Sequence, residues 1–297
     1  MGRANERSAV FEAERDHLFA VAYRMLGSAS EAEDALQEAF LRFAEHEAEV
    51  GSARAFLTTI VVRLCLDQLK SARARRETYV GPWLPEPLLS KQPPERGPDA
   101  RTELVESLSM AFLVLLERLS PLERAAFLLR EVFEQPFAEI ATTLGTTEVA
   151  IRQLVARARV HIDEQRPRYD ASEQKKQELL RAFVVACATA DPQALGDVLA
   201  ADVVAHSDGG GKVRSALKPI YGRDNVVRFL LGVGRKQPRT GAWEFAWVNG
   251  EPGISLRGEA GVELALTLSV VDGAIAQVWM VSNPDKLVYA SRPLRTP

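Results

Sequence analysis

The stretch FAEIATTLGTTEVAIRQLVARAR, residues 137–159, decides the fold class of the middle of this chain. Apolar residues recur in it every three or four positions, which predicts two helices. Gly145 suits the end of the first helix, because glycine adopts the left-handed conformation at little cost. Thr147 can cap the second helix with its hydroxyl group. Two short helices joined by a glycine turn predict a helix–turn–helix whose second helix enters a DNA groove.

The outer face of that second helix carries side chains suited to reading bases. Arginine and glutamine form paired hydrogen bonds with guanine and adenine, whereas a merely solvated helix more often alternates glutamate and lysine four residues apart. A plain solvated surface remains the alternative. The candidate DNA contacts are Glu148, Arg152, Gln153 and Arg157.

Upstream, residues 9–76 have a helical pattern throughout. SEAE at 30–33 is a capping-box pattern that predicts the start of a helix with one apolar face. The opposite face, turned to solvent or to a partner, carries Asp34, Gln37, Glu38 and Leu41. A third helix, at 53–76, is apolar in its first half and basic toward its end, with Arg63, Lys70, Arg73, Arg75 and Arg76.

Residues 80–100 differ in composition, because six prolines exclude a helix or a central strand there. We expect a stiff, extended linker. Its segment WLPEPLL places apolar side chains where a simple spacer gains nothing from them. We therefore expect Trp83, Leu84 and Leu88 to dock against another part of the protein. The alternative is a local cap on the first helical region.

From about residue 172 the pattern changes again, to helices first and strands after. Asp272-Gly273 is a hairpin signal between the last two strands. These features predict an α+β domain with an antiparallel meander. The expected helices are 174–191, 192–203 and 222–236, and the expected strands are 242–248, 253–258, 262–271 and 274–282.

HSDGGGK, residues 206–212, has the glycines and lysine of a phosphate loop but not their order. A Walker-type loop needs a glycine where His206 stands and Ser or Thr where Val213 stands. The glycines can instead adopt positive φ and let another backbone approach closely. Such a run suits a close contact with another part of the chain; a simple surface turn is the alternative.

Composition narrows the class of protein further. No apolar run approaches the roughly 20 residues of a membrane span, and the charged N-terminus does not resemble a secretory signal, so we expect a cytoplasmic protein without a membrane partner. Cys65 and Cys187 lie among apolar neighbours and are expected in the core. The four histidines lack metal-ligand spacing. No metal, cofactor or catalytic residue is expected.

Three stretches together resemble the compact, extracytoplasmic-function type of sigma-70 factor of bacterial RNA polymerase. AEDALQEAFLRF at 32–43 resembles the polymerase-binding helix of region 2, and RLCLDQLKSARARR at 63–76 resembles the helix that reads the minus-ten promoter element. Residues 137–159 resemble the region 4 helix–turn–helix that reads the minus-thirty-five element. The resemblance implies two partners, core RNA polymerase and promoter DNA.

Two positions depart from the family pattern. Arg63 stands where the family often has asparagine, and Lys70 stands where it usually has arginine. Lysine neutralises a phosphate but does not form the paired hydrogen bonds of arginine. The promoter sequence therefore cannot be carried over from the family.

The C-terminal part is similar in pattern to SnoaL-like domains of the nuclear-transport-factor-two-like fold, a cone of helices and curved sheet. The resemblance implies a sigma factor with a fused regulatory domain that replaces a separate anti-sigma protein. The expected organisation is region 2 at 1–79, the linker at 80–100, region 4 at 101–168 and the SnoaL-like domain at 172–297. The regulatory contacts implied are Trp83, Leu84, Pro85, Asp208, Gly209, Gly210, Gly211, Lys212, Asn283, Pro284, Asp285 and Lys286.

Two other functions stay open at this point. A helix–turn–helix regulator with a ligand domain would bind DNA without polymerase. A SnoaL-like cyclase or isomerase fused to a DNA-binding module would use a general base, for which Asp202, His206 and Asp224 are candidates by type. A small-molecule ligand could also bind in the C-terminal domain, against Trp243, Phe245 and Trp247, whose alternative role is core packing.

Overall fold

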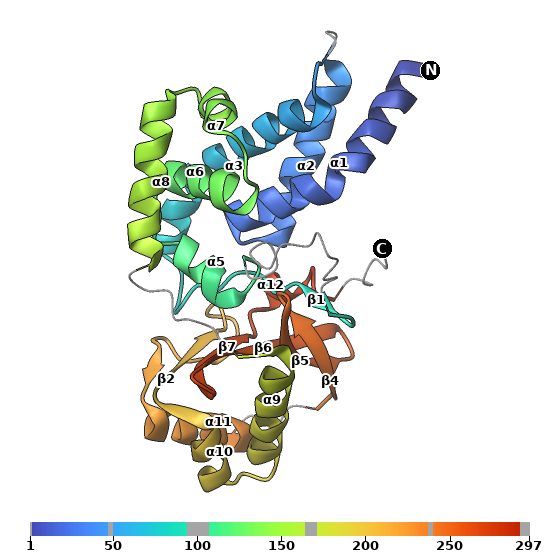
Figure 1. Ribbon diagram of the computed structural model, residues 1–297. Coiled ribbons are helices and arrows are strands. Elements are labelled where there is room, and N and C mark those ends of the chain that lie inside the picture. Colours follow the sequence, from blue (N-terminus) through green and yellow to red (C-terminus); the bar gives the residue numbers. More distant parts are fainter. Residues whose placement is uncertain (1, 47–49, 94–106, 164–170, 237–239, 292–297) are drawn as a thin grey trace. The chain divides into compact units, whose positions relative to one another are not determined.

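The computed structural model describes residues 2–46, 50–93, 107–163, 171–236 and 240–291. The chain divides into two units, drawn in Figure 1 with colours that follow the sequence. The first unit comprises Met1–Thr78, Arg101–Leu108 and Phe112–Arg166. The second comprises Tyr79–Ala100, Ser109–Ala111 and Pro167–Pro297, so the proline-rich segment groups with the C-terminal part.

The first unit begins with three helices, α1 (Gly2–Leu26), α2 (Ala29–Glu45) and α3 (Ala53–Glu77). Their apolar faces meet in a core in which Leu18 and Val61 are fully buried. The cap of α2 differs from the expectation at 30–33. Ser28, in extended conformation, accepts a hydrogen bond from the Glu31 amide, whereas Ser30 already lies inside the helix. The capping pattern is therefore Ser28 to Glu31, two residues earlier than expected.

The rest of this unit is also helical. It contains α5 (Met110–Leu116) from Phe112 onward, α6 (Pro121–Phe127), the π-helix η1 (Leu128–Val132), α7 (Phe137–Leu144) and α8 (Glu148–Asp163). Gly145 ends α7 with φ +66°, and the Thr147 hydroxyl accepts from the Ala150 amide at the start of α8. The expected helix–turn–helix is confirmed, with Gly145 ending its first helix and Thr147 capping its second.

Two buried arginines join the segments of the first unit. Arg24 on α1 donates to the Ser107 hydroxyl at 2.8 Å. Arg124 on α6 donates to the Met25 carbonyl at 2.7 Å and to Glu117 at 2.8 Å. Burial lowers the pKa of each guanidinium to about 10, so both stay charged at neutral pH and need these partners.

The second unit contains a seven-stranded sheet with the order β1-β4-β5-β6-β7-β2-β3. Strands β4 (Ala242–Val248), β5 (Glu251–Gly258), β6 (Gly261–Val271) and β7 (Ala274–Val281) form the expected antiparallel meander. Asp272 and Gly273, at φ +49° and +74°, make the expected tight turn between β6 and β7. Strand β2 (Leu199–Asp208) pairs in parallel with β7, and β3 (Ile220–Tyr221) pairs with β2.

Helices α9 (Glu173–Ala188), α10 (Pro192–Val198) and α11 (Arg223–Lys236) pack with the sheet, and α9 crosses β5 and β6 (Figure 1). Phe183 on α9, Val226 on α11 and Leu256 on β5 meet in one core. The expected helix at 192–203 is wrong in its second half, because Leu199–Val203 begins β2. The α+β class is confirmed.

The proline-rich segment contributes an edge strand to this sheet. Leu89 and Ser90 form β1 and pair with Val248 and Trp247 of β4. The short helix α12 (Pro284–Leu287) follows β7. Among the described residues, no helix is both long enough and apolar enough to cross a membrane.

Candidate functional site

The outer face of α2 is open to solvent. Asp34 and Gln37 are exposed, and the Leu41 side chain is 49% exposed, unusual for a large apolar residue on a helix whose other face is buried. Glu38 accepts a hydrogen bond from Arg42 one turn later at 2.8 Å. An acidic face with an exposed leucine suits a protein partner.

On α3, the basic residues expected to meet the minus-ten element have different environments. Arg63 donates from Nε to the Thr143 carbonyl at the end of α7, at 3.2 Å. Lys70 forms an exposed pair with Asp67 at 2.8 Å. Arg73, Arg75 and Arg76 lie in the last turns of α3, but their side chains are outside what the structure describes.

The contact of Arg63 belongs to a wider junction between α3 and the helix–turn–helix. The Thr59 and Thr143 hydroxyls are 3.2 Å apart. Beside them is a cleft of about 550 Å³, lined by Arg63, Leu66, Asp67, Lys70, Ser120, Pro121, Leu122 and Leu144. In this arrangement the helix expected to read one promoter element is packed against the region expected to read the other.

The recognition helix α8 presents an exposed Gln153 and an exposed Arg152. The Arg152 guanidinium lies over the Phe137 ring, 4.2 Å from its centroid, and also bonds to Glu148 at 3.4 Å. Stacking on an aromatic ring restricts the guanidinium without using its outward-facing donors. The remaining donors of the exposed Arg152 guanidinium therefore face solvent.

Arg157 has a different environment from Arg152. Its Nε donates to Glu123 at 3.0 Å, and Glu123 also completes the capping box of α6 with Ser120. Although burial opposes it, hydrogen bonds from Ser120 and Arg157 hold the pKa of Glu123 below its ordinary value. Arg157 thus ties α8 to α6 in addition to facing solvent.

In the second unit, the proline-rich segment is held by one buried carboxylate. Asp208, the last residue of β2, is fully buried. Its Oδ2 accepts from the Leu84 amide at 2.9 Å and from Lys286 Nζ at 2.7 Å. Its Oδ1 accepts from the Tyr79 hydroxyl and from the Gly210 amide.

Lys286 completes this enclosure of the segment from α12. Its ammonium also donates to the Leu84 carbonyl, so both backbone groups of Leu84 are bonded to one buried ion pair. The same ammonium lies over the Trp83 ring at 4.1 Å and the Tyr79 ring at 4.7 Å. Residues 84–87 are all buried. We name Tyr79, Leu84, Asp208 and Lys286, with Asn283, the linker clamp.

Asn283 orients the tyrosine of the clamp. Its side-chain amide donates to the Tyr79 hydroxyl at 2.8 Å, while its Oδ1 caps α12 by accepting from the Asp285 amide. Pro284 occupies the first turn of that helix. Burial, with a further contribution from Asp208, raises the pKa of Tyr79 well above its ordinary value, so the hydroxyl stays a donor.

The glycines beside Asp208 are required by space and by conformation. A Cβ on Gly209 would lie 2.2 Å from the Val213 carbonyl oxygen, and one on Gly210 would lie 2.2 Å from Asn283 Nδ2. Gly210 and Gly211 have φ +58° and +72°. On Gly211, a Cβ would lie 3.1 Å from Val80 Cβ in the linker. The run allows the close approach expected of it.

Lys212 forms an exposed ion pair with Asp285 at 2.7 Å, and no hydrogen bond or ion pair joins it to the described part of the linker, residues 80–93. Two contacts that the sequence analysis missed are those of Tyr79, assigned there to region 2, and of Asn249. The Leu88 amide donates to Asn249 Oδ1 at 3.1 Å, and the Asn249 amide donates to the Leu88 carbonyl at 2.8 Å. The Asn249-Gly250 turn signal was available in the sequence, but the partner of its side chain was not.

The candidate catalytic residues lack the environment of a general base. Asp202 lies in β2 and Asp224 in the first turn of α11, and both are exposed. His206 stacks on Trp279 with ring centroids 4.3 Å apart, and burial lowers its pKa to about 4. An exposed carboxylate lacks the burial that raises the pKa of a catalytic base. No cluster of three or more potential metal ligands occurs among the described residues.

The three tryptophan and phenylalanine residues considered for a ligand lie on β4. Trp243 and Phe245 are 53% and 62% exposed, and Trp247 is half-buried. Phe245 and Trp247 line a groove between β4 and α9, while Trp243 is not among its lining residues.

Comparisons with known proteins identify the family of the chain. Residues 10–75 match the family Sigma-70 region 2, and residues 109–162 match the family Sigma-70, region 4. The chain is 40% identical over 295 residues to the ECF RNA polymerase sigma factor SigJ of Mycobacterium tuberculosis, covering 96% of this chain and 94% of that protein. It is 31% identical over 293 residues to the probable ECF RNA polymerase sigma factor SigI of the same species, covering 97% of each.

One solved structure matches along almost the whole chain. The crystal structure of the Mycobacterium tuberculosis extracytoplasmic function sigma factor SigJ superposes with a TM-score of 0.75 and 37% sequence identity. The match covers 97% of this chain and 100% of that one, so it includes the C-terminal sheet as well as the helical regions.

Proposed function

This protein belongs to the ECF RNA polymerase sigma factors, and from that premise we propose that it directs core RNA polymerase to promoters under the control of its own C-terminal domain. The face of α2 with Asp34, Gln37, Glu38 and Leu41 binds core polymerase. The basic side of α3 engages the minus-ten element, and α8 engages the minus-thirty-five element. The protein works in the cytoplasm beside its polymerase, and this role needs no covalent chemistry from the chain.

The two promoter-reading helices contribute in different ways. Lysine and arginine neutralise phosphates and give affinity that falls with salt concentration. Base contacts from Arg152 and Gln153 give discrimination of about 1–3 kcal/mol per good pair. The bond from Arg63 to the Thr143 carbonyl has to break before Arg63 can reach promoter DNA. The arrangement described above is therefore a state that precedes promoter binding.

The linker clamp carries the proposal of control in cis. The segment it holds joins the two promoter-reading regions along the chain, and its Leu84 peptide is enclosed by Asp208 and Lys286. Because that segment is stiffened by proline, a grip at one point restricts the conformations of both ends. The clamp and its target are in one chain, so the contact forms at an effective concentration around millimolar and needs little intrinsic affinity.

The linker clamp is sensitive to the loss of either charge of its buried ion pair, Asp208 and Lys286. A buried ion pair adds little to stability over an apolar pair, but removing one partner leaves an uncompensated buried charge at a cost of about 3–5 kcal/mol. Asp208 and Lys286 have 0% and 8% exposed side chains. An isosteric Asp208→Asn change removes the charge but keeps the shape, so it loosens the linker without deleting the domain.

Transcription from one promoter by core polymerase tests the proposal. We expect Asp208→Asn to change transcript yield at least threefold, with core-polymerase affinity within twofold of wild type. Lys212→Met is the matched control, because Lys212 pairs with Asp285 at the surface and has no hydrogen bond or ion pair with linker residues 80–93. Equal yields from wild type, Asp208→Asn and Lys212→Met would sink the proposal of control in cis while leaving the sigma activity intact.

The alternative functions are less well supported. A helix–turn–helix regulator that acts without polymerase has no use for the acidic α2 face or the basic α3. An enzyme would need a buried base, whereas Asp202 and Asp224 are exposed and His206 stacks on Trp279. Failure of the full-length protein to bind core polymerase would favour the regulator.

A further inference from the structure

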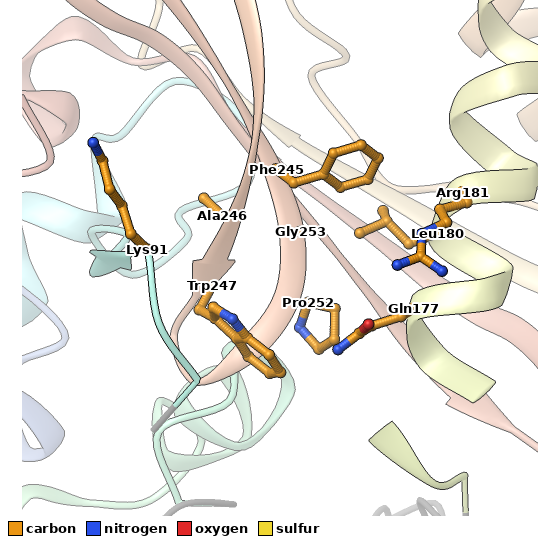
Figure 2. A pocket seen from close by; sticks show the side chains of 9 residues that line it. All are labelled: Lys91, Gln177, Leu180, Arg181, Phe245, Ala246, Trp247, Pro252 and Gly253. Atoms are coloured by element: carbon orange, nitrogen blue, oxygen red, sulfur yellow. The ribbon is translucent and has the colours of Figure 1, made fainter. Parts of the chain in front are cut away.

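A groove of about 270 Å³ lies between β4 and α9 in the C-terminal domain (Figure 2). One wall is aromatic, with Phe245 and Trp247 of β4. The other wall is polar, with Gln177 and Arg181 of α9, and Pro252 lies between the two walls. Its other lining residues are Lys91, Leu180, Ala246 and Gly253.

Both walls have binding capacity that the fold does not use. Phe245 is 62% exposed, although burying an aromatic ring is favourable. Within the described part of the chain, Arg181 has no hydrogen-bond or ion-pair partner, so its five donors are available. The nearby carboxylates are engaged: Glu251 pairs with Lys176 at 2.9 Å, and Glu173 accepts from Gln177 at 3.3 Å.

The chemistry of the walls specifies a class of ligand. A guanidinium binds a carboxylate through two parallel hydrogen bonds. The Gln177 amide donates one N–H to Glu173 and keeps a second N–H as a further donor. Aromatic side chains favour a flat ring. The groove is slightly below the usual size of drug-sized pockets, so it suits a molecule of one or two rings. We infer that this groove binds a small planar aromatic carboxylate.

The groove is also connected to the linker. Trp247 on its aromatic wall pairs in the sheet with Ser90 of the linker strand β1, and Lys91, the next residue, borders the groove. A ligand that contacts this edge stabilises the docked linker, and the docked linker strengthens ligand binding by the same factor. This second step rests on the proposed function, whereas binding itself does not.

Binding of 2-naphthoate to the full-length protein, measured by titration calorimetry, tests the site directly. We expect saturable binding, with 2-naphthylmethanol, its neutral analogue, at least tenfold weaker. Arg181→Met keeps the apolar stem of the side chain and should weaken 2-naphthoate at least tenfold. Arg235→Met, an exposed arginine of α11 that does not line the groove, changes net charge equally and should leave the affinity within twofold.

Several results would overturn the inference. These are absence of saturable binding, equal affinities for the acid and the alcohol, or equal effects of Arg181→Met and Arg235→Met. A dimer in sedimentation velocity that Phe245→Ser dissociates, without naphthoate binding, would assign the aromatic wall to a second copy of the chain.

Hydrogen exchange tests the link to the linker separately. With saturating 2-naphthoate, we expect the Leu84 and Leu88 amides to exchange at least threefold more slowly. Suppose that 2-naphthoate slows exchange at these amides but that Asp208→Asn leaves the transcript yield unchanged. The first result would support the ligand site, and the second would count against control in cis. Unchanged exchange at proven saturation would overturn the coupling.

Discussion

Asp208 shows how one buried carboxylate can hold a distant segment of chain. It ends a strand, and its two oxygens accept from four donors, of which Leu84 belongs to the linker and Tyr79 directly precedes it. The three glycines that follow it allow the turn and the close approach of Asn283 and Val80. Lys212, the other charged residue of the motif, is used elsewhere, in a surface pair.

Asp208→Ala should destabilise the C-terminal domain by about 3–5 kcal/mol, because Lys286 would remain buried without its counter-charge. Lys212→Met should cost about 0–1 kcal/mol, as expected of an exposed pair. Urea unfolding followed by tryptophan fluorescence measures both, since Trp83, Trp243, Trp247 and Trp279 all belong to the second unit. Similar losses for the two variants would contradict the special role of the clamp.

His206 should make the same domain sensitive to acid. Its pKa is about 4 in the folded protein and about 6.5 when unfolded, so between these values the unfolded state binds the extra proton. Stability is therefore lost as pH falls from about 6.5 to about 4. His206→Phe keeps a ring against Trp279 and removes this loss.

The measurement is the free energy of unfolding of wild type and His206→Phe at pH 7.5, 6, 5 and 4. The difference between them should shift in favour of the variant as pH falls, by no more than about 1.4 kcal/mol per pH unit. A difference that does not change with pH would mean that His206 titrates alike in both states.

At the scale of elements, α8 combines reading with attachment. Arg152 stacks on Phe137 and bonds to Glu148 of its own helix, whereas Arg157 is bonded to Glu123 of α6. The two arginines belong to one basic tract in the sequence, yet they differ in what their loss should do. Similarly, α3 presents Arg63 to the end of α7 and Lys70 to its own Asp67.

Arg152→Ala should change promoter preference, with relative use of two promoters that differ in the minus-thirty-five element shifting by about 1–3 kcal/mol, or roughly 5–150-fold. Competition transcription with both templates measures it. Arg75→Ala should weaken both templates alike, as expected for a phosphate contact. Equal losses on both templates for Arg152→Ala would count against base reading.

At the scale of the molecule, the proline-rich segment has two structural roles. It connects the promoter-reading regions in the chain, and it completes the sheet of the C-terminal domain as the edge strand β1. Residues 84–87 of the segment are buried within that unit, with Leu84 only 1% exposed. The domain that we propose to be regulatory is part of the same chain, so it cannot dissociate as a separate anti-sigma protein can.

Truncation should separate the two roles. We expect a protein ending at residue 168 and one ending at residue 205 to bind core polymerase, because the α2 face precedes both ends, but to differ from full length in transcript yield. Transcription with core polymerase from a single promoter measures this. Identical yields from all three proteins would contradict control by the C-terminal domain, and loss of polymerase binding by the shorter one would mean that region 2 depends on it.

Local patterning predicts three parts of this protein: the helix–turn–helix with Gly145 and Thr147, the long basic α3, and the strand meander with its Asp272-Gly273 turn. Hydrophobic periodicity and turn residues are local features of the sequence, so helices, strands and turns can be predicted from them without knowledge of the fold. The expected contact between the linker and DGGGK came from the resemblance to sigma factors with a fused domain, and not from the spacing of residues in the sequence.

The pairing of distant segments follows from the folded domain and not from local patterning. The parallel contact of β2 with β7 turned an expected helix at Leu199–Val203 into a strand, because a partner strand outweighs a weak local preference. The same pairing puts His206 opposite Trp279 and brings Asp208 within reach of Leu84 and Lys286. Such contacts depend on the free energy of the whole assembled domain, so they cannot be predicted from any short stretch of sequence.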